Sequence, residues 1–420
     1  MGLIFASNTS YSVQSIHTQE QPILQSDDKL TCISEFMNDD NDYNLSDYNQ
    51  ISIGYLIKKR WRVICLLGCG HFSSVWLVYD YKADDFRSLK IIRKTDASYS
   101  DMINNEIKMF DLLGETGFHI NVVRVYNKFI YRKKGYKYHC IVMEVLGKNL
   151  LDFARNYNNN RIPENIVKNI ARDSLNGLQY IHSLGALHTD IKPENICVKV
   201  HKSNIMKFGI VMWNKYSDIL GPCIVKSPVS SNTSCIKYID SFIITDFGSV
   251  IFPLEEENKA CFDIVTREYR PPEIILGWRY NKKKYKKLEK KTVDLWHVDI
   301  WSIGCVIFEL LCGNYLFDPY NNPVNSTDAD HMVLIKELLG DIPLELIKNG
   351  LYSHEIFKNT NDFYNNIKFN YCSLYKTLTD IYKIDSVSAI KINDFLMPML
   401  SLNPYERITA SECLKSEWIK

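Results

Sequence analysis

The sequence predicts an α+β protein in which a small β-rich part precedes a larger helical part. Three observations support this division. Short runs of β-branched and aromatic residues, separated by turn residues, dominate residues 61–147. Beyond Gly147, apolar residues recur at helical spacing, as in residues 163–184. Residues 298–313 are apolar nearly all round, which is typical of a helix buried at the centre of a large domain.

The composition is that of an ordinary globular protein. The 420 residues are 46% hydrophobic and 24% charged, which excludes a wholly disordered, collagenous or coiled-coil chain. The net charge is only +1, so the molecule as a whole is not a binder of polyanions, and we expect no direct contact with nucleic acid. The twelve cysteines are scattered without a CxxC pair, which argues against a zinc ribbon or a redox motif.

The amino terminus does not resemble an export signal. MGLIFASNTS has no basic region and no long apolar core, and the longest apolar stretch is too short to span a bilayer. We therefore expect an intracellular protein, in the cytoplasm, the nucleus or both, with reduced cysteines and no membrane association. No heptad pattern indicates an oligomer, so we expect a monomer.

The elements follow one another in a simple order. Residues 1–54 are acidic and rich in Asn, and such a segment buries too little apolar surface to fold alone. Strand-like runs follow, with one helical stretch among them at 101–113; the runs cover residues 61–67, 73–80, 88–94, 121–129 and 138–146. The break between the two parts falls near Gly147, so that residues 55–147 and 148–420 form two lobes.

Two stretches of the second lobe look inserted. Residues 199–240 show no clear periodicity, and we expect a long surface loop there. Residues 279–293 include a lysine-rich run, which is usually a solvated loop. A role for this basic loop in holding phosphate already added to a substrate is the alternative.

A glycine-containing turn lies between the first two strands. Gly68 and Gly70 let backbone N–H groups approach phosphates, and Ser73 and Val75 follow on the next strand. Alone this pattern is weak, since a tight hairpin turn gives the same signal. Lys90 lies on the third strand, where it could reach phosphates under the turn, and Glu106 on the following helix could pair with it.

The decisive segment is HTDIKPEN, residues 188–195. Asp190 and Asn195 place a base for a hydroxyl proton and a ligand for Mg²⁺ on one tight loop. Lys192 is positioned to neutralise charge on a transferring phosphoryl group. Further on, Asp246 in DFG would bring a hard oxygen ligand to the same metal.

In this order and spacing, these segments resemble the eukaryotic protein kinases over residues 55–420. The resemblance implies a bilobal protein-kinase fold with a small β-rich N-lobe and a larger α-helical C-lobe. It implies ATP and Mg²⁺ between the lobes, with a hinge at Glu144–Val145–Leu146 that begins after Met143. It also implies three structural residues: an ion pair of Glu273 with Arg407, and Asp299 as a brace of the catalytic loop.

A finer resemblance is to the SR-protein kinase group. It is carried by GCGHFSSVWL, HTDIKPENI, GNYLFDPY, DADHMVLIKELLG, GLYSHEIF and DFLMPMLSLNPYERITASECL. It implies transfer of phosphate to protein serines in Arg/Ser-rich substrates such as splicing factors. By this resemblance Asp330 and Glu337 would dock basic substrates, and seven residues apart on a helix they share one face. An ordinary amphipathic helix with exposed acids is the alternative.

Some residues depart from that group, and other readings compete. Asn314, Ile381 and Ile384 stand where the group has other docking residues, which weakens the substrate inference more than the inferred kinase activity. YRPPEIILGW is similar to the LAMMER (CDC-like) dual-specificity kinases, which are the alternative within the enzyme class. A catalytically weak kinase-fold scaffold is the alternative outside it. Because Thr189 cannot pair with a phosphate as an arginine would, we expect activity without activation-loop phosphorylation.

Overall fold

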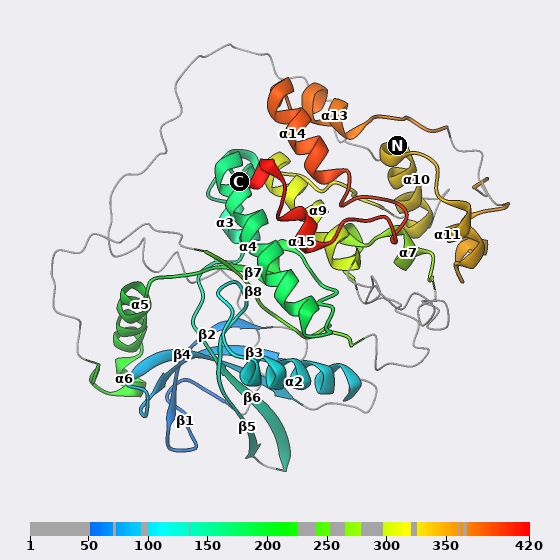
Figure 1. Cartoon of the computed structure of the whole chain (residues 1–420). Coiled ribbons are helices and arrows are strands. Elements are labelled where there is room, and N and C mark those ends of the chain that lie inside the picture. The colour runs from blue at the N-terminus through cyan, green and yellow to red at the C-terminus, as the bar shows by residue number, and fades with distance from the viewer. Residues whose placement is uncertain are drawn as a thin grey trace.

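The computed structural model describes ten stretches of the chain. They are residues 51–69, 73–93, 100–133, 135–225, 241–252, 265–278, 297–320, 326–359, 362–363 and 368–420. Gly70 and most of the acidic segment 1–54 lie outside the described residues, as does the basic insertion 279–293. Two lobes are visible, a β-sheet lobe and a helical lobe (Figure 1).

The first lobe is built on one antiparallel sheet with strand order β1-β2-β3-β4-β6-β5. Its strands are β1 Leu56–Ile57, β2 Trp61–Cys69, β3 Ser73–Asp80, β4 Asp85–Arg93, β5 Val125–Lys133 and β6 Tyr136–Met143. The runs of β-branched and aromatic residues that predicted these strands place one set of side chains, including Trp61, Trp76 and Leu89, in one buried cluster of the sheet.

The acidic segment ends earlier than its expected boundary at residue 54. Ile51 is buried against this cluster, and Ile53 packs beside it. Gly54 has a φ of 83° and its N–H donates to Val63. Two apolar side chains at alternate positions were enough to fix residues 51–54 to the sheet.

Helix α2, Ser100–Glu115, crosses beside the sheet. It buries Met109 and Phe110 in the same core cluster as Phe247, and the Phe110 and Phe247 rings meet edge to face at 5.7 Å. Since Phe247 follows Asp246, the helix that carries Glu106 is fixed to the segment that carries Asp246.

The second lobe is built around α9, His297–Cys312, in which every residue except Glu309 is buried. It packs on α4, Glu164–Ser183, and a two-stranded antiparallel sheet of β7 Ile196–Val198 and β8 Phe242–Ile244 lies against α4. Further α-helices of this lobe are α3 Leu150–Ala154, α7 Pro272–Ile275, α10 Thr327–Leu339, α11 Leu344–Asn349, α12 Ser353–Ile356, α13 Leu374–Lys376, α14 Ser386–Leu396 and α15 Ala410–Cys413.

The insertion 199–240 is not the loop that we expected. Its described part forms α5, Lys202–Lys215, and α6, Ser217–Leu220, which lie beside the sheet of the first lobe (Figure 1). Phe208, Met212 and Trp213 are buried against strand residues such as Tyr79 and Phe86. Apolar residues fill 205–213 with only Lys207 and Gly209 between them, so the stretch lacks the one-sided periodicity by which a surface helix is found.

Among the described residues, no helix is both long enough and apolar enough to cross a membrane.

Candidate active site

A cavity of ≈ 320 Å³ lies between the two lobes. The expected nucleotide-binding residues Gly68, Ser73, Val75, Glu144 and Leu146 all line it. So do the chemical groups that the sequence singled out from distant segments, namely Lys90, Asn195 and Asp246, together with Met143. The cavity also has a residue that sequence reasoning did not find, Cys197, which the β7–β8 pairing places there.

Lys90 is the centre of an ion-pair group. Its ammonium donates to Glu106 Oε1 at 2.5 Å and to Asp246 Oδ1 at 2.7 Å. Burial disfavours the charged form, but the two carboxylates outweigh it and raise the pKa of Lys90 above its usual value. Lys90 therefore stays positively charged, and its ion pair with Glu106 on α2 fixes where its ammonium group points.

Asp246 stays ionised in this arrangement. The Lys90 ammonium lowers its pKa to about 2, although burial acts in the opposite direction. Its backbone has a φ of 61°, a left-handed conformation that costs a non-glycine residue free energy. The carboxylate nevertheless keeps half of its side-chain surface exposed, at 51%.

Asp190 lies in a compact hydrogen-bonded group. Its Oδ2 accepts from Asn195 Nδ2 at 3.0 Å and is 2.9 Å from Lys192 Nζ. Its Oδ1 accepts from the Thr266 hydroxyl at 2.6 Å, and Lys192 Nζ also donates to that hydroxyl at 3.1 Å. The contact with Thr266 joins residues 76 apart in sequence, which the motif spacing did not predict.

The loop that carries Asp190 is held from below. Asp299, fully buried on α9, accepts the backbone N–H groups of His188 and Thr189 at 2.9 and 2.8 Å. Thr189 has a φ of 62°, and its hydroxyl donates to the carbonyl of Ser249 at 2.7 Å. Asp299 thus braces the loop as expected, and Thr189 joins it to the segment after Asp246 through a neutral bond.

Glu273 and Arg407 form the expected ion pair. The guanidinium donates to both carboxylate oxygens, at 2.7 and 2.9 Å, and both side chains are fully buried. The guanidinium also donates to the carbonyl of His297, at the start of α9. The pair therefore fixes α7 to the centre of the helical lobe.

Asp330 and Glu337 lie on α10 and do not line the cavity. Both side chains are mostly buried, with 4% and 7% of each residue exposed. Asp330 Oδ2 accepts the N–H of Tyr320, and Glu337 Oε1 accepts the N–H of Asn370. They are near enough that the Asp330 charge contributes to the raised pKa of Glu337, which burial mainly causes. The sequence predicted either a docking site or exposed acids on an amphipathic helix, and neither prediction included hydrogen bonds from backbone N–H groups to these carboxylates.

Sequence reasoning missed a second acidic group. Glu309 Oε2 accepts the hydroxyl of Tyr269 at 2.7 Å. Burial raises the pKa of Glu309 to about 7, and the charges of Glu194 and Glu268 add to this effect. Glu194 precedes Asn195, and Glu268 is two residues beyond Thr266, so the group lies beside Asp190. The sequence did hold one signal for this group, because Glu309 is an acidic residue within the apolar helix α9.

Comparison with known proteins places these residues in a family context. The model of the protein kinase domain matches residues 61–220 and 233–419. A serine/threonine-protein kinase named SRPK from Physarum polycephalum is 29% identical over 404 residues, covering 90% of each chain. Protein kinase dsk1 from Schizosaccharomyces pombe is 28% identical, covering 90% of this chain and 84% of its own. SRSF protein kinase 3 from Homo sapiens is 25% identical, covering 95% and 92%.

Proposed function

Because the chain belongs to the protein kinase family, we propose that it phosphorylates serines in Arg/Ser-rich protein segments, such as those of splicing factors, with Mg²⁺ as its metal. The chain is an ATP-dependent serine/threonine protein kinase of the SR-protein kinase type. The substrate, the metal and the role of each residue are the parts that we infer.

The oxygen donors in the cavity suit a hard divalent cation. Asp246 offers an ionised carboxylate that is half exposed. Asn195 gives its Nδ2 to Asp190, which leaves its side-chain oxygen for a metal. Oxygen ligands of this kind suit Mg²⁺, which when bound neutralises charge on the nucleotide phosphates.

The remaining groups position the reactants. Lys90, held by Glu106, would bind the nucleotide phosphates, and the residues Gly68 to Val75 would cover them. Asp190 would orient the serine hydroxyl and accept its proton, since its Oδ1 already accepts from one hydroxyl, that of Thr266. Lys192, 2.9 Å from Asp190, would stabilise the negative charge on the transferring group.

The observation that carries the substrate class is the group of acids beside Asp190. Burial is the main cause of the raised pKa of Glu309, and the charges of Glu194 and Glu268 add to it, so arginines from a substrate would relieve the repulsion among these acids. Asp330 and Glu337 are proposed as a second docking point. Each accepts one backbone N–H with a carboxylate oxygen, and substrate guanidinium groups would bind at the outer edge of these two carboxylates.

The test measures phosphate transfer from ATP to an Arg-Ser repeat peptide, with a proline-directed and an acidic peptide beside it. We expect the Arg-Ser peptide to be preferred, and Asp246→Asn to abolish transfer. Glu309→Gln should raise KM for this peptide about 10-fold, because a charged hydrogen bond contributes about 1.5–3 kcal/mol. Glu417→Gln, which removes an acid that is 87% exposed near the end of the chain, is the matched control.

Two outcomes would count against parts of the proposal. Preference for another peptide would leave the kinase and remove the Arg/Ser-rich substrate. An unchanged KM in both Glu309→Gln and the double variant Asp330→Ala, Glu337→Ala would remove the two acidic groups as docking points.

A further inference from the structure

A row of alternating cations and aromatic rings lies behind the hinge, outside the catalytic cavity. We call Arg87, Tyr126, Arg124, Phe118 and Lys199 the cation–aromatic row. The Tyr126 ring is contacted by Arg87 at 4.1 Å and by Arg124 at 5.1 Å. The Phe118 ring is contacted by Arg124 at 5.0 Å and by Lys199 at 5.2 Å. Four cation–π contacts thus join side chains from β4, β5 and the segments before β5 and after β7.

The row is open to solvent. Phe118 is 52% exposed and Tyr126 is 41% exposed, and Ile120 beside them is 56% exposed. Large apolar side chains this exposed, gathered with cations, mark a surface for interaction more often than isolated ones do. The row lies on the far side of Glu144, whose carboxylate accepts the backbone N–H of Arg124 at 2.8 Å.

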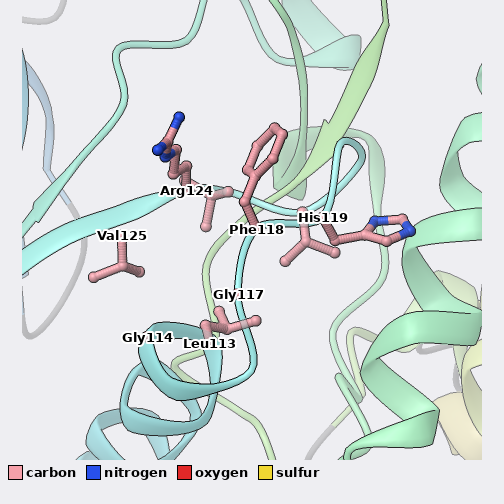
Figure 2. Close-up of a pocket in the computed structure, with 9 residues that line it drawn as sticks. Leu113, Gly114, Gly117, Phe118, His119, Arg124 and Val125 are labelled. Carbon is pink, nitrogen blue, oxygen red and sulfur yellow. The ribbon is translucent and has the colours of Figure 1, made fainter.

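Arg124 is the unused donor of this surface. Its guanidinium makes the two ring contacts, but within the described part of the chain it has no side-chain hydrogen bond and no ion pair. Its guanidinium carbon is 5.0 and 5.1 Å from the two ring centroids, and a guanidinium can pair with a carboxylate through two N–H groups. Figure 2 shows Arg124 and Phe118 rising on the same side of the segment between α2 and β5.

A small pocket adjoins the row. It has a volume of ≈ 180 Å³ and is lined by Leu113, Gly114, Gly117, Val122, Phe118 and Arg124, among others (Figure 2). Pockets for metabolites usually measure roughly 300–1,000 Å³, so this one is sized for a single side chain. An apolar group and an anion could therefore bind side by side.

The charge of the surface selects the partner. Arg87, Arg124 and Lys199 lie in the row, and Lys202 reaches its edge. Two carboxylates lie near them: Asp85 pairs with Arg87 and Lys202, and Glu144 Oε2 is 4.0 Å from Lys199 Nζ, so the four cations outnumber the carboxylates around them. Since each ring already contacts two cations, the row does not offer a stacking platform for nucleic-acid bases.

We propose that the cation–aromatic row and its pocket bind an acidic peptide segment of a partner protein. Carboxylates of the peptide pair with Arg124 and Lys199, and one apolar side chain of the peptide enters the pocket beside Phe118. The five side chains of the row do not line the catalytic cavity, although Val123 lines both that cavity and the small pocket, so we expect the bound peptide to leave the substrate sites accessible.

The test is fluorescence anisotropy of a labelled peptide that carries five Asp residues around a single Leu, titrated with the full chain at low salt. Arg124→Gln and Phe118→Ala should each raise the Kd for this peptide at least about 10-fold. A control peptide with Asn in place of each Asp should show a similar rise in Kd. Lys391→Gln, which removes an exposed lysine on α14, should leave Kd unchanged. Arg124→Lys keeps the charge without the planar fork and should give an intermediate Kd.

Transfer of phosphate to a substrate peptide should stay unchanged in Arg124→Gln, which shows that the variant is folded. An unchanged Kd in both Arg124→Gln and Phe118→Ala would overturn the proposal. If phosphatidylserine vesicles bound in an Arg124-dependent way and the peptide did not bind, the partner of the row would be a lipid surface and not a peptide. Tighter peptide binding in a chain with Asp39, Asp40, Asp42 and Asp47 changed to Asn would assign the surface to the chain's own acidic segment instead.

Discussion

Two helical glycines, Gly114 and Gly209, are expected to change the free energy of unfolding in opposite directions when each is replaced by Ala. A Cβ on Gly209 of α5 would lie 2.4 Å from carbons of the Phe86 ring, whereas a Cβ on Gly114 of α2 would meet nothing within 4 Å. Replacing a helical glycine by Ala gains about 1 kcal/mol in each helix. At Gly209 this gain is opposed by overpacking, which costs about 1–3 kcal/mol.

We therefore expect Gly114→Ala to raise the free energy of unfolding by up to about 1 kcal/mol, and Gly209→Ala to lower it by up to about 2 kcal/mol. The assay is urea unfolding followed by tryptophan fluorescence, which also reports directly on Trp213 beside Phe86 and Tyr79. An equal gain in the two variants would refute the reasoning, because it would mean that α5 does not press on the sheet at Gly209.

Two further predictions concern activity and pH. The Thr189 hydroxyl joins the catalytic loop to the carbonyl of Ser249 through a neutral hydrogen bond, so kinase activity should survive phosphatase treatment. This prediction would be contradicted if phosphatase abolished activity and a single phosphorylation between residues 249 and 266 restored it. Burial holds a proton on Glu309 up to about pH 7, whereas Glu309 in the unfolded chain releases its proton near pH 4.5. The native state therefore binds more protons than the unfolded state between these two pH values. The free energy of unfolding should fall as the pH rises through that window. Urea unfolding at pH 5 and pH 8 should show this fall, and it should be smaller in Glu309→Gln; an equal fall in both chains would exclude Glu309 as its source.

The cavity residues could be predicted from sequence because phosphoryl transfer demands particular groups at particular spacings. Asp190 and Asn195 are five residues apart on one turn, and that local spacing survives in the sequence. The strands could be predicted for a similar reason, since the runs of β-branched and aromatic residues in β2 and β3 are a local signal.

Contacts between distant segments could not be predicted in the same way. Thr266 reaches Asp190 across 76 positions, and nothing in either segment points to the other. Helix α5 was missed because its apolar residues surround it instead of forming one stripe. Asp330 and Glu337 were placed on one helix face correctly, but their burial depends on Tyr320 and Asn370, which come from loops.

The ion pair of Glu273 with Arg407 has a consequence for how the protein is made. The two residues are 134 positions apart, so Arg407 is synthesised long after Glu273. Until Arg407 leaves the ribosome, Glu273 has no counter-ion, and burying a lone carboxylate is strongly unfavourable. We expect the N-lobe to fold during translation, as N-terminal units generally do, while α7 waits for Arg407. A chain that ends before Arg407 would therefore lack the ion pair that fixes α7 to the helical lobe.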